Sequence, residues 1–172
     1  METLLVERSR NWTNYYIKLK SGFRTTFLYT ENSDSTHRIS SLHLPYPTLC
    51  FRLMFDNQMS KLQVLRYGVL RGEEVYSFNK YLCCDSTGFV CMSRYCEYTR
   101  LPDCSPIEEK IDDIIKYFWT SAFWNGRTVG IRPYPAWDSI LLKDNSGVDL
   151  DDLPWQLSHF PAFRAPYPQV LG

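Results

Sequence analysis

The clearest pattern in the chain is a recurrence of apolar side chains at every third or fourth position between residues 107 and 122. Such spacing gathers those side chains on one side of an α-helix. Ser105 and Glu108 stand three residues apart at the start of this run with a proline between them, which is typical of a capped helix start. We therefore predict a helix over residues 106–122 whose apolar stripe packs against another element.

Several other stretches are rich in aromatic and β-branched residues, which predicts β-strands. The longer ones are residues 23–30, 48–54, 75–82 and 89–99, and the shorter ones are 127–131 and 140–143. Asp85-Ser86-Thr87-Gly88 separates two of them and is typical of a turn. A hairpin is therefore expected around this turn.

The stretch from residue 42 to residue 68 combines an edge strand with an expected short helix. Pro45 and Pro47 confine its first part to an extended sheet edge, because proline cannot donate a hydrogen bond to a neighbouring strand. Asp56 is a typical helix N-cap, and apolar residues follow at positions 59, 62 and 65. We predict a short helix here that ends at Gly68.

The last part of the chain differs from the rest in composition. Residues 151–172 hold prolines among aromatic side chains, which predicts an irregular tail that is either packed by its aromatic rings or extended toward a partner. The expected fold class is α+β, with a mostly antiparallel sheet against the 106–122 helix. We expect a single domain over residues 1–150, followed by the tail over residues 151–172.

Charge excludes one large class of function. The 19 basic and 19 acidic residues cancel, whereas a general nucleic-acid binder needs a basic excess to neutralise phosphates. Aromatic residues make up 16% of the chain, and such side chains favour contact surfaces, so we expect protein partners. No stretch resembles a signal peptide or an apolar membrane span. Taken as it stands the sequence predicts a soluble intracellular protein, and taken as part of a longer chain it leaves the compartment open.

Five of the six cysteines fall within one 22-residue window. These are Cys83, Cys84, Cys91, Cys96 and Cys104, and the sixth cysteine is Cys50. Adjacent residues on a strand point to opposite faces, so Cys83 and Cys84 would need different partners. This favours disulfides to separate elements, and six cysteines allow three bridges in an oxidising compartment.

Other interpretations of the cysteines remain open. The thiolates of four of them can hold zinc, although the chain has no Cys-x-x-Cys pair. These four are Cys84, Cys91, Cys96 and Cys104. Buried free thiols, which pack as small apolar groups, are the third interpretation. A cysteine hydrolase would pair Cys50 with His43, but no nucleophile motif surrounds them. We therefore expect no enzymatic activity, and no cofactor other than zinc.

Asn11-Trp12-Thr13 is an N-glycosylation sequon. Asn11 is therefore a glycosylation candidate if this segment faces a secretory lumen. The sequon points to the same oxidising environment as the disulfide interpretation.

The segment 42–50, Leu-His-Leu-Pro-Tyr-Pro-Thr-Leu-Cys, is followed by Phe55, Lys61-Leu62 and Tyr67-Gly68-Val69. This passage, within about residues 26–69, resembles the segment after the first membrane span of the degenerin/epithelial sodium channel family. The resemblance implies an extracellular, disulfide-bonded piece of a trimeric sodium-permeable channel, with Cys50 as a disulfide half. It further implies a short helix at the Lys-Leu…Tyr-Gly stretch. Both membrane spans and the selectivity filter of the family are absent from this sequence, so such a fragment would not conduct ions itself.

Three functional hypotheses follow from the sequence. The leading one is a non-enzymatic, disulfide-bonded extracellular domain or fragment, a glycoprotein that resembles part of a sodium-channel ectodomain and is membrane-associated only as a piece of a longer subunit. The alternative is an intracellular zinc-binding adaptor, such as a viral accessory protein. A cysteine-dependent hydrolase is the third.

Overall fold

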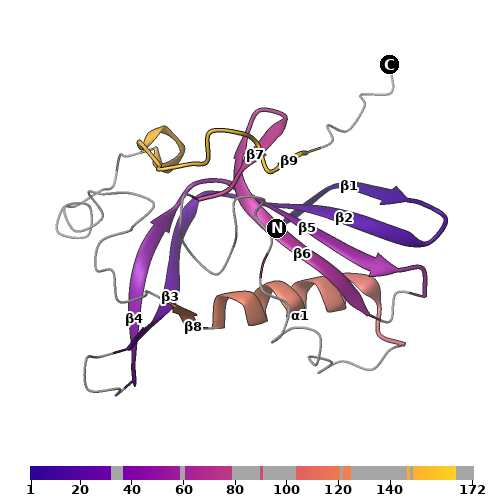
Figure 1. The fold of residues 1–172 in the computed structure, drawn as a ribbon, viewed down its shortest axis with the longest axis horizontal. Coiled ribbons are helices and arrows are strands. Elements are labelled where there is room, and N and C mark those ends of the chain that lie inside the picture. Colours follow the sequence, from indigo (N-terminus) through magenta and orange to yellow (C-terminus); the bar gives the residue numbers. More distant parts are fainter. Residues whose placement is uncertain are drawn as a thin grey trace.

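Two β-sheets and one long helix make up the described fold (Figure 1). The computed structural model of the protein describes residues 1–31, 37–58, 61–78, 90, 104–120, 122–124, 147 and 149–165. The strands are β1 (Glu2–Arg8), β2 (Trp12–Leu19), β3 (Gly22–Glu31), β4 (His37–Tyr46), β5 (Leu49–Asp56), β6 (Leu62–Arg71), β7 (Glu74–Tyr76), β8 (Ala122–Trp124) and β9 (Phe163–Arg164). The helices are α1 (Ile107–Thr120) and the short 3-10 helix η2 (Leu150–Asp152).

The larger sheet has six strands in the order β1-β2-β5-β6-β7-β9, and all its described pairs are antiparallel. The smaller sheet has the order β4-β3-β8, and only its β3–β8 pair is parallel. The predicted α+β class with a mostly antiparallel sheet is therefore confirmed. Strand β4 lies at an edge of its sheet, as Pro45 within it predicts.

Helix α1 occupies most of the range that the sequence predicts and packs against one face of the six-stranded sheet. The ring of Phe118 lies 5.2 Å from the ring of Phe51 on β5 and 4.8 Å from that of Tyr67 on β6. All three side chains are fully buried. On its solvent side, Lys116 pairs with Asp112 at i,i+4 spacing. The apolar stripe of α1 thus meets the alternate, inward-pointing residues of the central strands.

The prediction of a short helix after Asp56 is wrong. Strand β5 runs to Asp56, and residues 62–71 form β6. Leu65, Tyr67 and Val69 are fully buried at every second position, which is the period of a strand. Gly68 does not end a helix: a Cβ atom at this residue would lie 2.4 Å from the carbonyl oxygen of Tyr76, so glycine permits the close approach of β7.

The first two strands, β1 and β2, are not among the elements that the sequence predicts. Every residue of β2 from Thr13 to Ile17 is buried, because both faces of this strand are covered. Tyr15, Ile17 and Leu19 point to the core, while Asn14, Tyr16 and Lys18 point to the other face. Because aromatic rings occupy both faces at Tyr15 and Tyr16, the contrast between the two faces is weak in the sequence.

Residues 149–165 are packed against the sheet, which is one of the two arrangements expected for the C-terminal tail. Leu150 and Trp155 are buried, and the expected domain boundary at residue 150 falls inside η2. The backbone N–H groups of Ser158, Ala162 and Ala165 donate to carbonyl groups of residues 73–77, and β9 pairs with β7. Residues 149–165, which we call the C-terminal strap, therefore complete the edge of the six-stranded sheet.

Several predicted elements lie outside the described residues. These are residues 79–82 of the 75–82 strand, the 89–99 strand except Val90, and the strands expected at 127–131 and 140–143. In the described part of the chain, no helix is long and apolar enough to cross a membrane.

Candidate functional site

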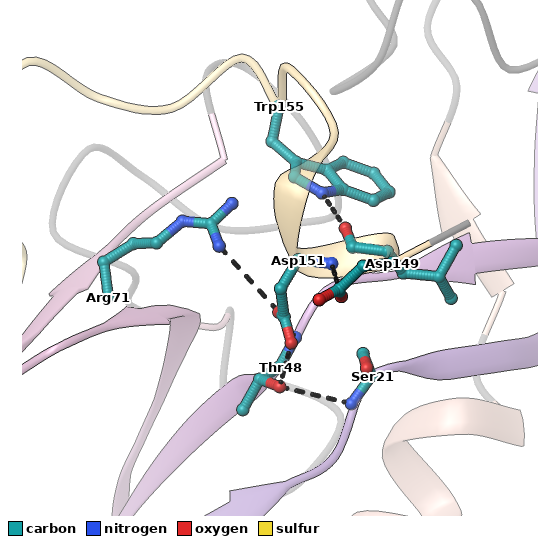
Figure 2. Close-up of polar contacts among 7 residues, drawn as sticks. Ser21, Thr48, Arg71, Asp149, Asp151 and Trp155 are labelled. Carbon is teal, nitrogen blue, oxygen red and sulfur yellow. Dashed lines mark hydrogen bonds and ion pairs between the residues drawn. The ribbon is translucent and has the colours of Figure 1, made fainter. Parts of the chain in front are cut away.

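One cluster of polar contacts joins the C-terminal strap to the body of the fold (Figure 2). The carboxylate of Asp151 accepts two hydrogen bonds from Thr48, from its backbone N–H at 2.6 Å and from its hydroxyl at 2.8 Å. The guanidinium of Arg71 lies 3.9 Å from the same carboxylate. Three donor groups therefore converge on one carboxylate, which fixes η2 to the start of β5.

The surrounding contacts support this joint. The backbone N–H of Ser21 donates to the Thr48 hydroxyl, and Asp149 accepts from the backbone N–H of Asp151 (Figure 2). The indole N–H of Trp155 donates to the carbonyl of Leu150 at 2.7 Å. These polar groups are engaged within the chain. The cluster therefore has the chemistry of a structural joint.

A different arrangement occupies the outer face of the six-stranded sheet, the face turned away from α1. Phe51 and Leu65 point toward the helix, so the alternating residues Arg52 and Arg66 point outward. The register places Arg52 directly opposite Arg66 on the neighbouring strand, and Tyr16 directly opposite Arg52 on the other side. Two cationic side chains thus lie side by side in the middle of this face.

Neither arginine has an acidic partner among the described residues. Both are half-buried, and the Nε atom of each is shielded from solvent without a hydrogen-bond acceptor. The guanidinium of Arg52 lies 6.0 Å from the centroid of the Tyr16 ring, within cation–π range. Like charges directly opposite on an antiparallel pair are destabilising, and so is a buried donor without an acceptor. An oxyanion between the two guanidinium groups would relieve both costs.

One acidic residue borders this arrangement. The carboxylate of Glu7 accepts hydrogen bonds from the side-chain amide of Asn14 at 2.9 Å and from the hydroxyl of Tyr16 at 3.2 Å. Burial raises the pKa of Tyr16 above its ordinary value, the charge of Arg52 opposes this shift and Glu7 adds to it. The Tyr16 hydroxyl therefore stays protonated near neutral pH and acts as a hydrogen-bond donor.

The two described cysteines, Cys50 and Cys104, are free thiols in the structure. Cys50, which the resemblance implied as a disulfide half, is fully buried in a small apolar cluster on the outer face, where Phe163 and Ala165 of the C-terminal strap also pack. The Cys50 thiol therefore packs as a small apolar group among these side chains. Cys104 is exposed. Bridges among Cys83, Cys84, Cys91 and Cys96 concern residues outside the described part of the chain.

Cys50 and His43 do not form a catalytic pair. His43 is exposed on the smaller sheet, where its ring stacks on Phe23 at 5.5 Å, whereas Cys50 is sealed in the larger sheet. Burial raises the pKa of the Cys50 thiol to about 12. A nucleophilic cysteine needs the opposite shift, toward the thiolate. This geometry gives Cys50 the properties of a structural core residue.

We expect iodoacetamide to leave Cys50 of the native protein unmodified at pH 8, because its thiol is protonated and inaccessible. The exposed Cys104 serves as the internal control and should react under the same conditions. Peptide mapping by mass spectrometry, before and after unfolding in denaturant, measures both sites. Stoichiometric modification of Cys50 in the native protein would contradict this assignment.

The glycosylation sequon and the candidate zinc ligands remain to be located in the structure. Asn11 is exposed in the turn between β1 and β2, while Thr13 of the same sequon is 2% exposed. Within the described ranges, no three histidine, cysteine or acidic residues gather in a group that could hold a metal ion. Of the four zinc-ligand candidates, Cys104 is described and the other three lie outside those ranges.

The pair of arginines was not singled out by sequence reasoning. Each arginine stands between buried residues of its own strand, which places its side chain on the outer face. That Arg52 lies directly opposite Arg66 depends on the register between β5 and β6. A bulge between Met54 and Phe55 shifts that register. Comparison with known proteins adds no assignment: no family model matches this chain, and neither a curated protein nor a solved structure matches it.

Proposed function

We propose that this protein acts by binding, not by catalysis, and that it contacts a protein partner through the outer face of its six-stranded sheet. The observation that carries the proposal is the opposition of Arg52 and Arg66 on that face without an acidic partner among the described residues. The opposed arginines lower the stability of the sheet. Features that lower stability in this way concentrate at functional sites.

The neighbouring side chains support an interaction surface. Met54 on β5 and Val64 on β6 lie on the same face as the two arginines. Both side chains are half-buried. Arginine, methionine and aromatic residues are enriched in protein interfaces relative to other surfaces. An acidic partner surface would complement the charge of this face.

The compartment in this proposal is a reducing one. The free thiols of Cys50 and Cys104 support this proposal, because they leave at most four of the six cysteines for disulfides. The sodium-channel resemblance implied a bridged Cys50 and a short helix near residues 61–69, where the structure has a free thiol and strand β6. We therefore favour an intracellular interaction protein over a disulfide-bonded channel ectodomain.

Photo-crosslinking tests the proposed surface. We expect p-benzoylphenylalanine at Val64 or at Met54 to form an adduct with the same partner protein in intact cells. Lys116 is the control, because its side chain is exposed on α1, which packs against the opposite face of the sheet. Adducts that depend on position in this way support the proposal. Equal adducts from Lys116 and Val64, or none from either outer-face position, would refute it.

A further inference from the structure

We infer that the outer face of the six-stranded sheet holds a site for a phosphate group, with the guanidinium groups of Arg52 and Arg66 as its two cationic walls. This inference rests on the proposed function, since it names the chemistry that the same face recognises. It is carried by the register of β5 and β6 and by the unfilled hydrogen-bonding capacity of the two side chains.

The geometry of the pair suits one ligand between two guanidinium groups. Directly opposite residues of an antiparallel pair have Cβ atoms about 5 Å apart, so both side chains reach the same volume above the sheet. Contact with the Tyr16 ring fixes the guanidinium of Arg52 on one side. Each guanidinium carries five N–H donors in a planar fork, and no hydrogen bond from either arginine occurs within the described part of the chain.

The charge of the pair favours a phosphate over a carboxylate. Two guanidinium groups contribute two positive charges, and a phosphate monoester carries close to two negative charges at neutral pH. Its three terminal oxygens can accept from both forks at once, whereas the two oxygens of a carboxylate match a single fork. Met54 and Val64 beside the arginines are apolar, and they lower the local screening by water.

The other charged groups on this face leave the space between the arginines free of acidic competition. Glu7 lies on β1, opposite Asn14, and is held there by Asn14 and Tyr16. Tyr16 therefore stands between this carboxylate and Arg52. Lys18 on β2 pairs with Glu2 on the edge strand β1. Asp56 shares this face of β5, but it lies at the end of the strand, four residues from Arg52 and beyond Met54. A phosphate would bind on the Arg66 side of Arg52, between the two guanidinium groups.

Calorimetric titration of the full chain with O-phosphoserine, inorganic phosphate and acetate, at constant ionic strength and pH 7.5, tests the inference. We expect saturable binding of phosphate groups and none of acetate. Arg52→Gln or Arg66→Gln should weaken phosphoserine binding by roughly ten- to hundredfold, the usual loss for one charge-assisted hydrogen-bond partner. Lysine at either position keeps the charge without the fork and should weaken binding less.

Controls separate the site from general charge effects. Arg10→Gln and Lys61→Gln remove exposed positive charges elsewhere and should leave phosphoserine binding unchanged. Thermal unfolding checks the fold of each variant, and the glutamine variants at positions 52 and 66 should be no less stable than the parent, because the like-charge opposition is removed. Binding of phosphoserine should also fall at pH 5, below its second pKa of about 6.

The outcomes divide clearly. Phosphoserine binding tenfold tighter than inorganic phosphate supports a site for a phosphorylated group on the partner, and equal affinities support a site for the free anion. Equal binding of acetate, or phosphate binding that survives both glutamine substitutions, would overturn the inference. If phosphate fails to bind while Val64 still crosslinks its partner, the interaction face stands and the phosphate site does not. If both fail, the proposed function is also refuted.

Discussion

Replacing Phe118 by Ala is expected to lower the free energy of unfolding by about 3–5 kcal/mol. Phe118 is fully buried at the point where α1 meets the six-stranded sheet. Its ring contacts three others edge-to-face, those of Phe51, Tyr67 and Trp119, at 4.8–5.2 Å. Alanine would remove all three contacts and leave a cavity that rigid strands on one side cannot fill. Urea denaturation followed by circular dichroism measures the change.

Lys116→Ala is the matched control, since this residue lies on the same helix with an exposed side chain. Its ion pair with Asp112 is worth only a few tenths of a kcal/mol, so the variant should stay within about 0.5 kcal/mol of the parent. A loss below about 1 kcal/mol for Phe118→Ala would mean that α1 does not pack on the sheet as described.

Replacing Asp151 by Asn should cost about 2 kcal/mol and loosen the C-terminal strap before the rest of the fold. The carboxylate of Asp151 accepts from both donors of Thr48 and lies near Arg71. An asparagine amide has the same shape but offers one acceptor oxygen, so one Thr48 donor would face an NH₂ group and the ion pair would be lost. Native-state hydrogen exchange should show faster exchange at the amides of Ser158, Ala162 and Ala165.

Alkylation of Cys50 gives a second readout of the same event. Phe163 and Ala165 of the strap pack in the cluster that seals Cys50, so loosening the strap should let iodoacetamide reach this thiol. Asp152→Asn is the control, because its exposed side chain is the neighbour of Asp151 and lies outside the joint. Unchanged exchange and unchanged Cys50 labelling in Asp151→Asn would show that the joint does not hold the strap.

The parts of the fold that the sequence predicts well are those in which a single local period decides the structure. The 107–120 helix has one buried stripe, and strands β3 and β5 have the residue types and neighbouring breakers of strands. The short helix expected after Asp56 failed because apolar residues at 59, 62 and 65 fit a helical spacing by chance. Tertiary packing of Leu65, Tyr67 and Val69 against the core selected the strand.

The candidate site could not be predicted in the same way, because it depends on contacts between distant residues. Thr48 and Asp151 are 103 positions apart, and no local pattern connects a threonine before one strand with an acidic turn near the C-terminus. The opposition of Arg52 and Arg66 requires a register that a bulge alters. Cysteine spacing drew attention to disulfides, whereas the burial that keeps Cys50 as a thiol is a property of the folded sheet.

The position of β9 has a consequence for how the chain acquires its structure during synthesis. Strands β1, β2, β5, β6 and β7 all lie within the first 76 residues, and this part of the sheet can assemble early. The edge of β7 then waits for residues 163–164, which leave the ribosome some 90 positions later. During that interval the nascent sheet carries an unpaired edge that can join with other chains. A holdase chaperone that shields this edge would therefore raise the yield of correctly folded protein.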